Sequence, residues 1–114
     1  MSTDLIVRIS SAIVSESELG SYFADLETSV IPNYEAARGM VTVYLLQRRF
    51  VAYIEVLTVS LWRSQDALGR FVESQSVTED VGRKYGAIEV EQRSFDVVLS
   101  RRGKLPADEE PPQT

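Results

Sequence analysis

The sequence contains no cysteine and no histidine among its 114 residues. Without cysteine the chain can form no disulfide and no thiolate metal site. Without histidine it can build neither a Ser–His–Asp triad nor a His-ligated zinc or haem centre. Any chemistry must therefore use carboxylates, Tyr, Arg, Ser, Asn or Trp, or the reactivity of the substrate itself. We predict no bound metal and no other cofactor.

Basic side chains are also scarce, since 12 Lys and Arg stand against 17 Asp and Glu, a formal net charge of -5. Phosphate contacts need clustered basic residues, so no nucleic acid partner is predicted. No apolar run approaches about 18 residues, which predicts no membrane span. The first ten residues lack the basic-then-apolar pattern of a signal peptide. We therefore expect a cytoplasmic protein without a membrane partner.

Hydrophobic residues make up 44% of the chain, enough for one domain with one core. Alternating patterns predict strands over 5–14, 40–48, 50–61 and 88–99, and on the first strand Arg8 and Ser10 lie opposite Val7 and Ile9. Helices are expected after Ser15 and Ser64, with a short further helix before the last strand. Pro32 is expected to disturb the first helix after about four turns. This order predicts an α+β, ferredoxin-like β-α-β-β-α-β fold with a four-stranded antiparallel sheet and helices on one face.

Two further features concern the ends of the helices and of the domain. The motif Ser15-Glu16-Ser17-Glu18 has the S-x-x-E pattern of a capping box. Residues 101–114 hold three of the four prolines and three acids. We predict a folded domain over 1–100 and a disordered tail over 101–114.

The strands are apolar on both faces for much of their length, as in "VAYIEVLTVSLW". The helices can cover only one face of the sheet, so the other would be exposed in a monomer. This pattern predicts a homodimer in which a second copy covers that face.

Three stretches resemble the antibiotic biosynthesis monooxygenase (ABM) family, a dimeric α/β-barrel group. They are "LIVRISSAIV", "IPNYEAARGMVTVYLLQR" and "LTVSLWRSQDALGRF", the last being an apolar strand that ends in Trp before a Ser-capped helix. The resemblance covers roughly residues 4–99. It implies a homodimer with facing sheets, and a pocket in each subunit between its own sheet and helices.

The resemblance also implies a function. Some ABM proteins oxygenate aromatic polyketides without metal or flavin, because the substrate carbanion itself gives electrons to oxygen. The haem-degrading branch combines an Asn, a Trp and a His, and of these the chain keeps only Trp62. We therefore expect a cofactor-independent monooxygenase, or a related enzyme, acting on an electron-rich phenolic or enolic substrate. The alternative is a non-catalytic binding or structural dimer on the same scaffold.

Three residues are candidates for a catalytic role: Trp62, Arg8 and Glu55. Trp62 is either a core anchor or a pocket wall. Arg8, inside an apolar strand, is either paired with Glu55 or Glu89 or free to clamp an enolate or carboxylate. Glu55 is either that ion-pair partner or, if desolvated, a general base.

Five further residues are candidates for binding the substrate. They stand on the first strand, on the two amphipathic helices, beyond the Pro32 break and near the last strand. They are Ser10, Tyr34, Phe23, Phe71 and Tyr85. The aromatic ones also fit a purely structural role in the core.

Overall fold

The structure, a computed structural model, describes residues 4–74 and 76–104. The elements follow one another as β1 (Ile6–Val14), α1 (Glu16–Asp25), a π-helical turn η1 (Leu26–Val30), α2 (Ile31–Ala36), β2 (Met40–Arg49), β3 (Ile54–Trp62), α3 (Gln65–Val72), α4 (Ser76–Lys84) and β4 (Ile88–Asp96). The four strands form one antiparallel sheet in the order β2-β3-β1-β4. This is the predicted α+β, ferredoxin-like arrangement.

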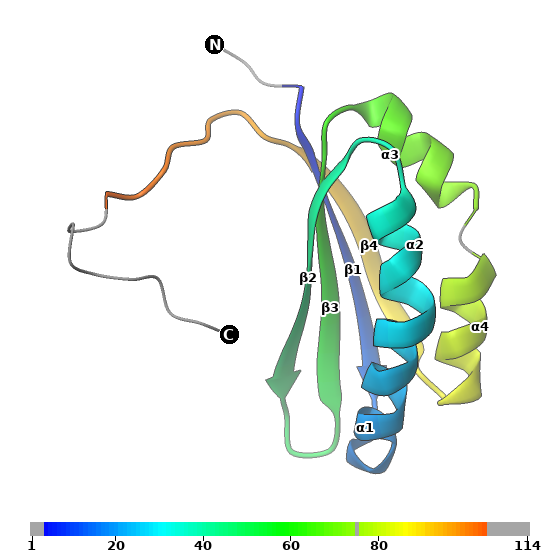
Figure 1. Cartoon of the computed structure of the whole chain (residues 1–114). Coiled ribbons are helices and arrows are strands. Elements are labelled where there is room, and N and C mark those ends of the chain that lie inside the picture. The colour runs from blue at the N-terminus through cyan, green and yellow to red at the C-terminus, as the bar shows by residue number, and fades with distance from the viewer. Residues whose placement is uncertain (1–3, 75, 105–114) are drawn as a thin grey trace.

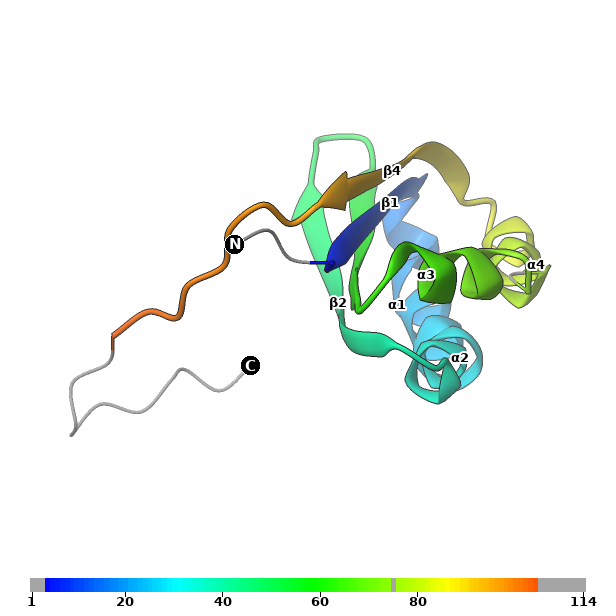
Figure 2. The same cartoon turned by 90° about the horizontal axis from the view of Figure 1, so that it is seen from above.

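All helices lie on one face of the sheet, as Figures 1 and 2 show. The register of the two central strands runs from Ile6 opposite Trp62 to Val14 opposite Ile54 without interruption. Directly paired residues share a face of a sheet. The even-numbered residues of β1 and β3 therefore face the helices, and the odd-numbered ones form the outer face.

The first helical segment continues past Pro32, which was expected to disturb it. A π-helical turn precedes α2, and Pro32 lies in the first turn of α2. Proline lacks the N–H that an α-helix interior needs and crowds the preceding turn. The wider π turn accommodates this defect, so α1, η1 and α2 form one continuous helical rod along the sheet (Figure 1).

The predicted capping box at the start of α1 is wrong in its side-chain bonds. The Ser15 side chain makes no cap bond and instead lies 3.2 Å from the Ser17 hydroxyl. The turn is closed by the backbone, because Glu18 N–H donates to the Ser15 carbonyl at 3.2 Å. Both serines are exposed, so water can satisfy the remaining amides. The Ser64 cap of α3 is confirmed, since its hydroxyl accepts from the Ala67 N–H at 3.2 Å.

Two predicted strand ends are also wrong. Strand β3 begins at Ile54, because residues 50–53 form the hairpin loop, in which the Phe50 N–H donates to the Tyr53 carbonyl at 2.9 Å. Strand β4 ends at Asp96, and Leu99 beyond it is exposed. An apolar loop extends the hydrophobic pattern of a strand, so alternation alone does not mark these ends. Of the predicted tail, residues 101–104 carry no regular secondary structure, and 105–114 lie outside the described residues.

The core lies between the sheet and the helices and is centred on three aromatic rings. Trp62 has no exposed surface, Tyr34 has 2% and Phe71 has 6%. The Phe71 ring centroid lies 4.9 Å from that of Trp62 and 4.4 Å from that of Tyr34. The Trp62 indole N–H donates to the Ser60 hydroxyl at 2.8 Å, so its one polar atom is satisfied inside the core.

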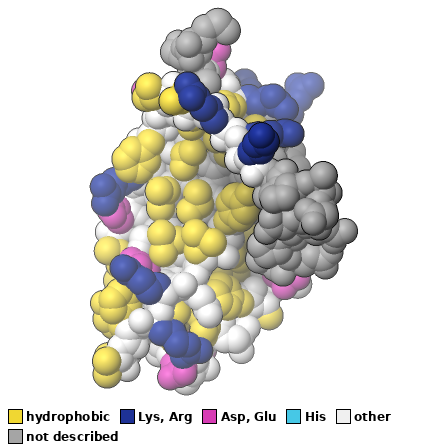
Figure 3. Space-filling model, turned by 90° about the vertical axis from the view of Figure 1, so that its left-hand side faces the viewer, with side chains coloured by type: hydrophobic (Ala, Val, Ile, Leu, Met, Phe, Trp, Pro, Cys, Tyr) yellow, Lys and Arg dark blue, Asp and Glu magenta, His cyan; other side chains and the backbone are white. Residues whose placement is uncertain are grey.

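The outer face of the sheet is apolar at its centre, as Figure 3 shows. Tyr44, Leu46 and Phe95 on this face are 57%, 46% and 45% exposed. Its hydrophobic side chains come from all four strands: Val7, Ile9, Ile13, Tyr44, Leu46, Leu57, Val59, Leu61 and Phe95. No helix in the described part of the chain covers this face. No helix among the described residues is both long and apolar enough to cross a membrane.

Candidate functional site

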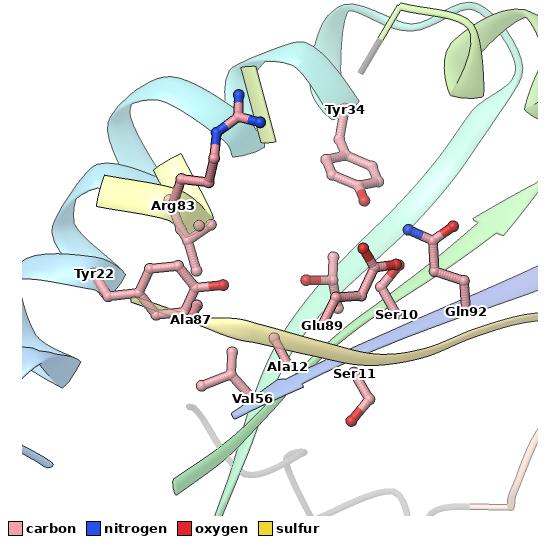
Figure 4. Close-up of a pocket in the computed structure, with 13 residues that line it drawn as sticks. Ser10, Ser11, Ala12, Tyr22, Tyr34, Val56, Arg83, Ala87, Glu89 and Gln92 are labelled. Carbon is pink, nitrogen blue, oxygen red and sulfur yellow. The ribbon is translucent and has the colours of Figure 1, made fainter. Parts of the chain in front are cut away.

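A cavity of about 290 Å³ lies between the sheet and the helical layer. Its volume is near the lower end of the roughly 300–1,000 Å³ that is typical of ligand pockets. Residues from three strands and four helical segments line it (Figure 4): Ser10, Ser11, Ala12, Tyr22, Leu26, Tyr34, Val56, Thr58, Gly82, Arg83, Ala87, Glu89 and Gln92. The cavity is the place where these distant parts of the chain meet.

A row of small polar side chains forms the floor of the cavity. Ser10 on β1 pairs with Thr58 on β3 and with Gln92 on β4. Because cross-strand partners share a face, their hydroxyl and amide groups lie side by side toward the helices. Together they offer hydrogen-bond donors and acceptors to one edge of a flat ligand.

Glu89 joins this floor because the ladder between β1 and β4 is irregular. Ser11 pairs with Glu91, but the next residue, Ala12, pairs with Glu89, so Val90 is the extra residue of a β-bulge. Ala12 faces the cavity, and its partner Glu89 therefore faces it too. Figure 4 shows the Glu89 carboxylate beside Ser10.

Two tyrosines from the helical rod, Tyr22 and Tyr34, form a wall of the cavity, and both hydroxyls point into it (Figure 4). Tyr34 is held by its contacts with the aromatic rings of the core. Burial, and to a smaller extent the neighbouring Tyr34, raise the pKa of Tyr22. Tyr22 therefore stays protonated at neutral pH and can donate a hydrogen bond into the cavity.

The rim of the cavity carries one cationic side chain, Arg83 on α4. Its guanidinium is ion-paired with Asp80 one turn earlier, and 72% of the side chain is exposed. A paired and solvated cation interacts weakly with a ligand inside the cavity. The described residues contain no group of three or more acidic side chains that could hold a metal ion.

Ser10 and Tyr34 are the two predicted binding residues that line the cavity. Phe23 and Tyr85 instead support Tyr22 from outside: the ring centroids lie 6.5 Å and 6.0 Å from that of Tyr22. The Tyr85 hydroxyl donates to Asp25, which lowers the pKa of that carboxyl and links α4 to α1. Phe23 and Tyr85 thus position a wall of the cavity without forming its surface.

Trp62 and Phe71 lie in the core behind Tyr34 and are not part of the cavity surface. Of the two roles predicted for Trp62, core anchor and pocket wall, the structure supports the core anchor, because the indole has no exposed surface. Its ring centroid lies 6.3 Å from that of Tyr34. Trp62 acts on the site by holding that tyrosine in place.

Of the two partners predicted for Arg8, Glu55 is wrong, because Arg8 and Glu55 lie on opposite faces of the sheet. The other, Glu89, is in none of the ion pairs between described side chains. Arg8 is buried on the helix side, opposite Ser60. Glu55 lies on the outer face, where its carboxylate accepts from the Ser11 hydroxyl at 3.0 Å and from Arg48 at 2.9 Å. Neither Arg8 nor Glu55 lines the cavity. A base role for Glu55 in this cavity is thus ruled out by its position.

Most residues that line the cavity were not among the predicted site residues, and four of them carry polar groups that the site uses: Tyr22, Thr58, Glu89 and Gln92. Tyr22 lies on the apolar stripe of α1 and resembled a core residue. Thr58 and Gln92 could have been found once Ser10 was placed, since a correct register puts them opposite it. Glu89 carries no such signal, because regular alternation would put Val90 in its place.

No protein family profile matches this sequence, and no curated protein matches it. Solved structures of similar fold do exist. A candidate antibiotic biosynthesis monooxygenase from Bacillus cereus superposes with a TM-score of 0.65 at 17% identity, over 87% of this chain and 98% of that one. SnoaB, a cofactor-independent oxygenase from Streptomyces nogalater, gives a TM-score of 0.56 at 18% identity, over 91% and 99% of the two chains.

The designed protein Foldit4 shares the fold as well, with a TM-score of 0.54 at 14% identity over 86% of this chain and 98% of that one. Several other structural neighbours are described as antibiotic biosynthesis monooxygenases or related oxygenases, all at low sequence identity. The chain therefore shares the α+β, ferredoxin-like fold of these proteins. A fold shared with a designed protein carries no activity by itself, so a function has to be argued from the cavity.

Proposed function

We propose that the protein is a cofactor-independent monooxygenase that acts on a small, electron-rich phenolic or enolic molecule bound in the cavity. The observation that carries this proposal is the convergence of hydroxyl, amide and carboxylate groups on one partly open cavity, which apolar side chains also line. Tyr22 and Tyr34 line it together with Ser10, Glu89 and Gln92. The likeness in fold to SnoaB, a cofactor-independent oxygenase, supports the same assignment.

The reaction would use molecular oxygen as the oxidant and the substrate as the source of electrons. The enolate of an anthrone-type substrate donates electrons to oxygen at its reactive CH₂ carbon. One oxygen atom becomes the new carbonyl of the product, and the other leaves as water with the two hydrogens of that carbon. The Tyr22 hydroxyl would stabilise the enolate oxygen by donating a hydrogen bond to it.

Oxygen uptake tests this proposal directly. The purified protein, treated with a chelator, is supplied with anthrones and quinols while dissolved oxygen is recorded. Tyr22→Phe removes one donor from the cavity and should lower the rate by about 10²-fold if that donor meets the enolate. Tyr53→Phe, the same chemical change in the β2–β3 hairpin, should leave the rate unchanged.

The second candidate function is a non-catalytic binding or structural dimer. It is favoured by the state of Arg83, because a guanidinium that is paired with Asp80 and largely exposed stabilises a developing negative charge only weakly. If the folded protein consumes no oxygen with any of these compounds yet binds them, the oxygenase proposal is wrong and the binding function remains.

We also propose that the protein works as a homodimer with the outer faces of two sheets packed together. The apolar centre of this face is flanked by charges of both signs, in the pairs Arg48–Glu55 and Arg93–Glu91. A two-fold axis brings a surface against its own copy, so mixed charges at the margin can meet opposite charges. A partner whose surface carried charges of only one sign would match this margin less well.

Sedimentation velocity at micromolar concentration tests the dimer. Val59→Lys puts a charge at the centre of the apolar face and should give a monomer. Ser29→Lys adds the same charge on an exposed part of the helical rod and should leave the dimer intact. A wild-type protein that sediments as a stable monomer would contradict the proposal.

A further inference from the structure

The β-bulge at Val90 changes which side chain of β4 faces the cavity. In a regular antiparallel ladder the neighbour of the pair Ser11–Glu91 would be Ala12–Val90. The observed pair is Ala12–Glu89, so a carboxylate takes the place of an isopropyl group in the floor. Val90 is 57% exposed instead. Bulges commonly re-aim a side chain beside a functional site.

The Glu89 carboxylate can still accept hydrogen bonds from a ligand. Within residues 4–74 and 76–104 it takes part in none of the hydrogen bonds or ion pairs between described side chains. The other acids nearby are engaged, since Glu91 is paired with Arg93 on the outer face and Asp80 with Arg83 at the rim. A carboxylate can only accept hydrogen bonds, so its natural complement in a ligand is an O–H or N–H donor.

We infer that Glu89 determines the charge and the donor pattern of the ligand: it accepts a hydrogen bond from a ligand hydroxyl and disfavours ligands that carry a carboxylate. This inference rests on the proposed function for the location of the substrate, and it narrows the substrate class to uncharged hydroxyaromatic molecules. The Tyr22 and Tyr34 hydroxyls, which also point into the cavity, are placed to meet a second oxygen of the same ligand (Figure 4).

The expected size of the effect follows from the charge on the acceptor. A hydrogen bond to a charged group contributes more than one between neutral groups, and losing it corresponds to about a tenfold or greater loss of affinity. An anionic ligand at the same place would meet a like charge, which weakens binding even though Glu89 is exposed and solvent screens part of the repulsion. Glu89 should therefore separate two ligands that differ only in carrying a hydroxyl or a carboxylate.

The test uses 2-naphthol and 2-naphthoate, a pair with the same ring system, and calorimetric titration of the full chain at pH 7. The phenol is neutral and the carboxylate is ionised at this pH. Wild type should bind naphthol at least tenfold more tightly than naphthoate. Glu89→Gln, which keeps the shape and removes the charge, should lose about tenfold for naphthol and gain affinity for naphthoate.

Glu91→Gln is the matched control, because it removes a charge from the same strand on the outer face. It should leave both affinities unchanged. The inference is overturned if wild type does not bind naphthol, if Glu89→Gln shifts both ligands in the same direction, or if it shifts neither. If Glu89 has a purely structural role, Glu89→Gln should shift the affinities for both ligands in the same direction and lower the melting temperature.

Oxygen uptake separates this inference from the oxygenase proposal. If Glu89→Gln reverses the preference and the wild type consumes no oxygen with any substrate, the inference holds and the oxygenase proposal fails. If the wild type consumes oxygen and Glu89→Gln leaves the ligand preference unchanged, the oxygenase proposal holds and the inference fails.

Discussion

Replacement of Trp62 by Phe should destabilise the protein strongly while leaving the cavity intact. Trp62 has no exposed surface, and its indole N–H donates to the Ser60 hydroxyl, which is itself buried. The change removes this hydrogen bond and part of the ring that packs on Phe71 and Tyr34. Since Trp62 does not line the cavity, ligand affinity should change little as long as the mutant is folded.

The magnitude has two parts. A buried hydroxyl that loses its partner costs about 1–3 kcal/mol. The smaller ring adds roughly 1–2 kcal/mol for lost contacts and residual cavity, less than the 3–5 kcal/mol of full truncation to Ala. We therefore expect the free energy of unfolding to fall by about 2–5 kcal/mol, in the upper range for a single substitution.

Urea unfolding followed by far-UV circular dichroism measures this loss, because the mutant lacks the only tryptophan and fluorescence is unsuitable. All variants are compared at one protein concentration, since dimerisation would couple to stability. Ser60→Ala completes a double-mutant cycle. If the hydrogen bond matters as argued, the double mutant should be more stable than the sum of the single losses predicts, by ~1 kcal/mol or more. Losses that add within about 0.5 kcal/mol would refute the role given to this bond.

The structure also predicts the effect of a glycine substitution and the dependence of stability on pH. Gly39 has φ +85°, and an added Cβ would lie 2.6 Å from the Ala67 Cβ. Gly39→Ala should therefore lower the free energy of unfolding, measured in urea, by ~1–3 kcal/mol. The control is Gly20→Ala in α1, where no heavy atom lies within 4 Å of the new Cβ, and it should be neutral or slightly stabilising. Burial raises the pKa of Tyr22, so the folded state holds its proton more tightly than the unfolded state. Its contribution is complete below its ordinary pKa near 10 and is lost as the pH rises through the raised pKa, so the melting temperature of wild type should fall more steeply above pH 10 than that of Tyr22→Phe.

Several features of this protein follow from the sequence alone, because they depend on neighbours along the chain. Helical spacing from Leu19 onward identifies the first helix, and Ser64 marks the start of α3 by a bond to an amide three residues away. The order of elements, read from these local patterns, leaves few ways to form one sheet. The fold could therefore be predicted, together with two residues of the cavity, Ser10 and Tyr34.

The remaining features were decided by contacts between distant strands. Alternation along β1 separates Arg8 from Ile9, but it does not say which of the two faces the helices, because both faces are rich in apolar residues. Only the register with β3 shows that Arg8 and Glu55 lie on opposite sides. Tertiary packing also placed Trp62 behind Tyr34 rather than beside a ligand.

The clearest case is Glu89. The sequence from Ile88 onward alternates as a regular strand, and by that pattern Val90 belongs to the face of Gln92. The bulge that reverses this assignment is a mismatch between β4 and β1, whose paired residues are nearly eighty positions apart, and no local pattern encodes it. The sequence determined the scaffold by short-range periodicity and capping, whereas the chemistry of the cavity depends on which residue of one strand lies opposite which residue of another.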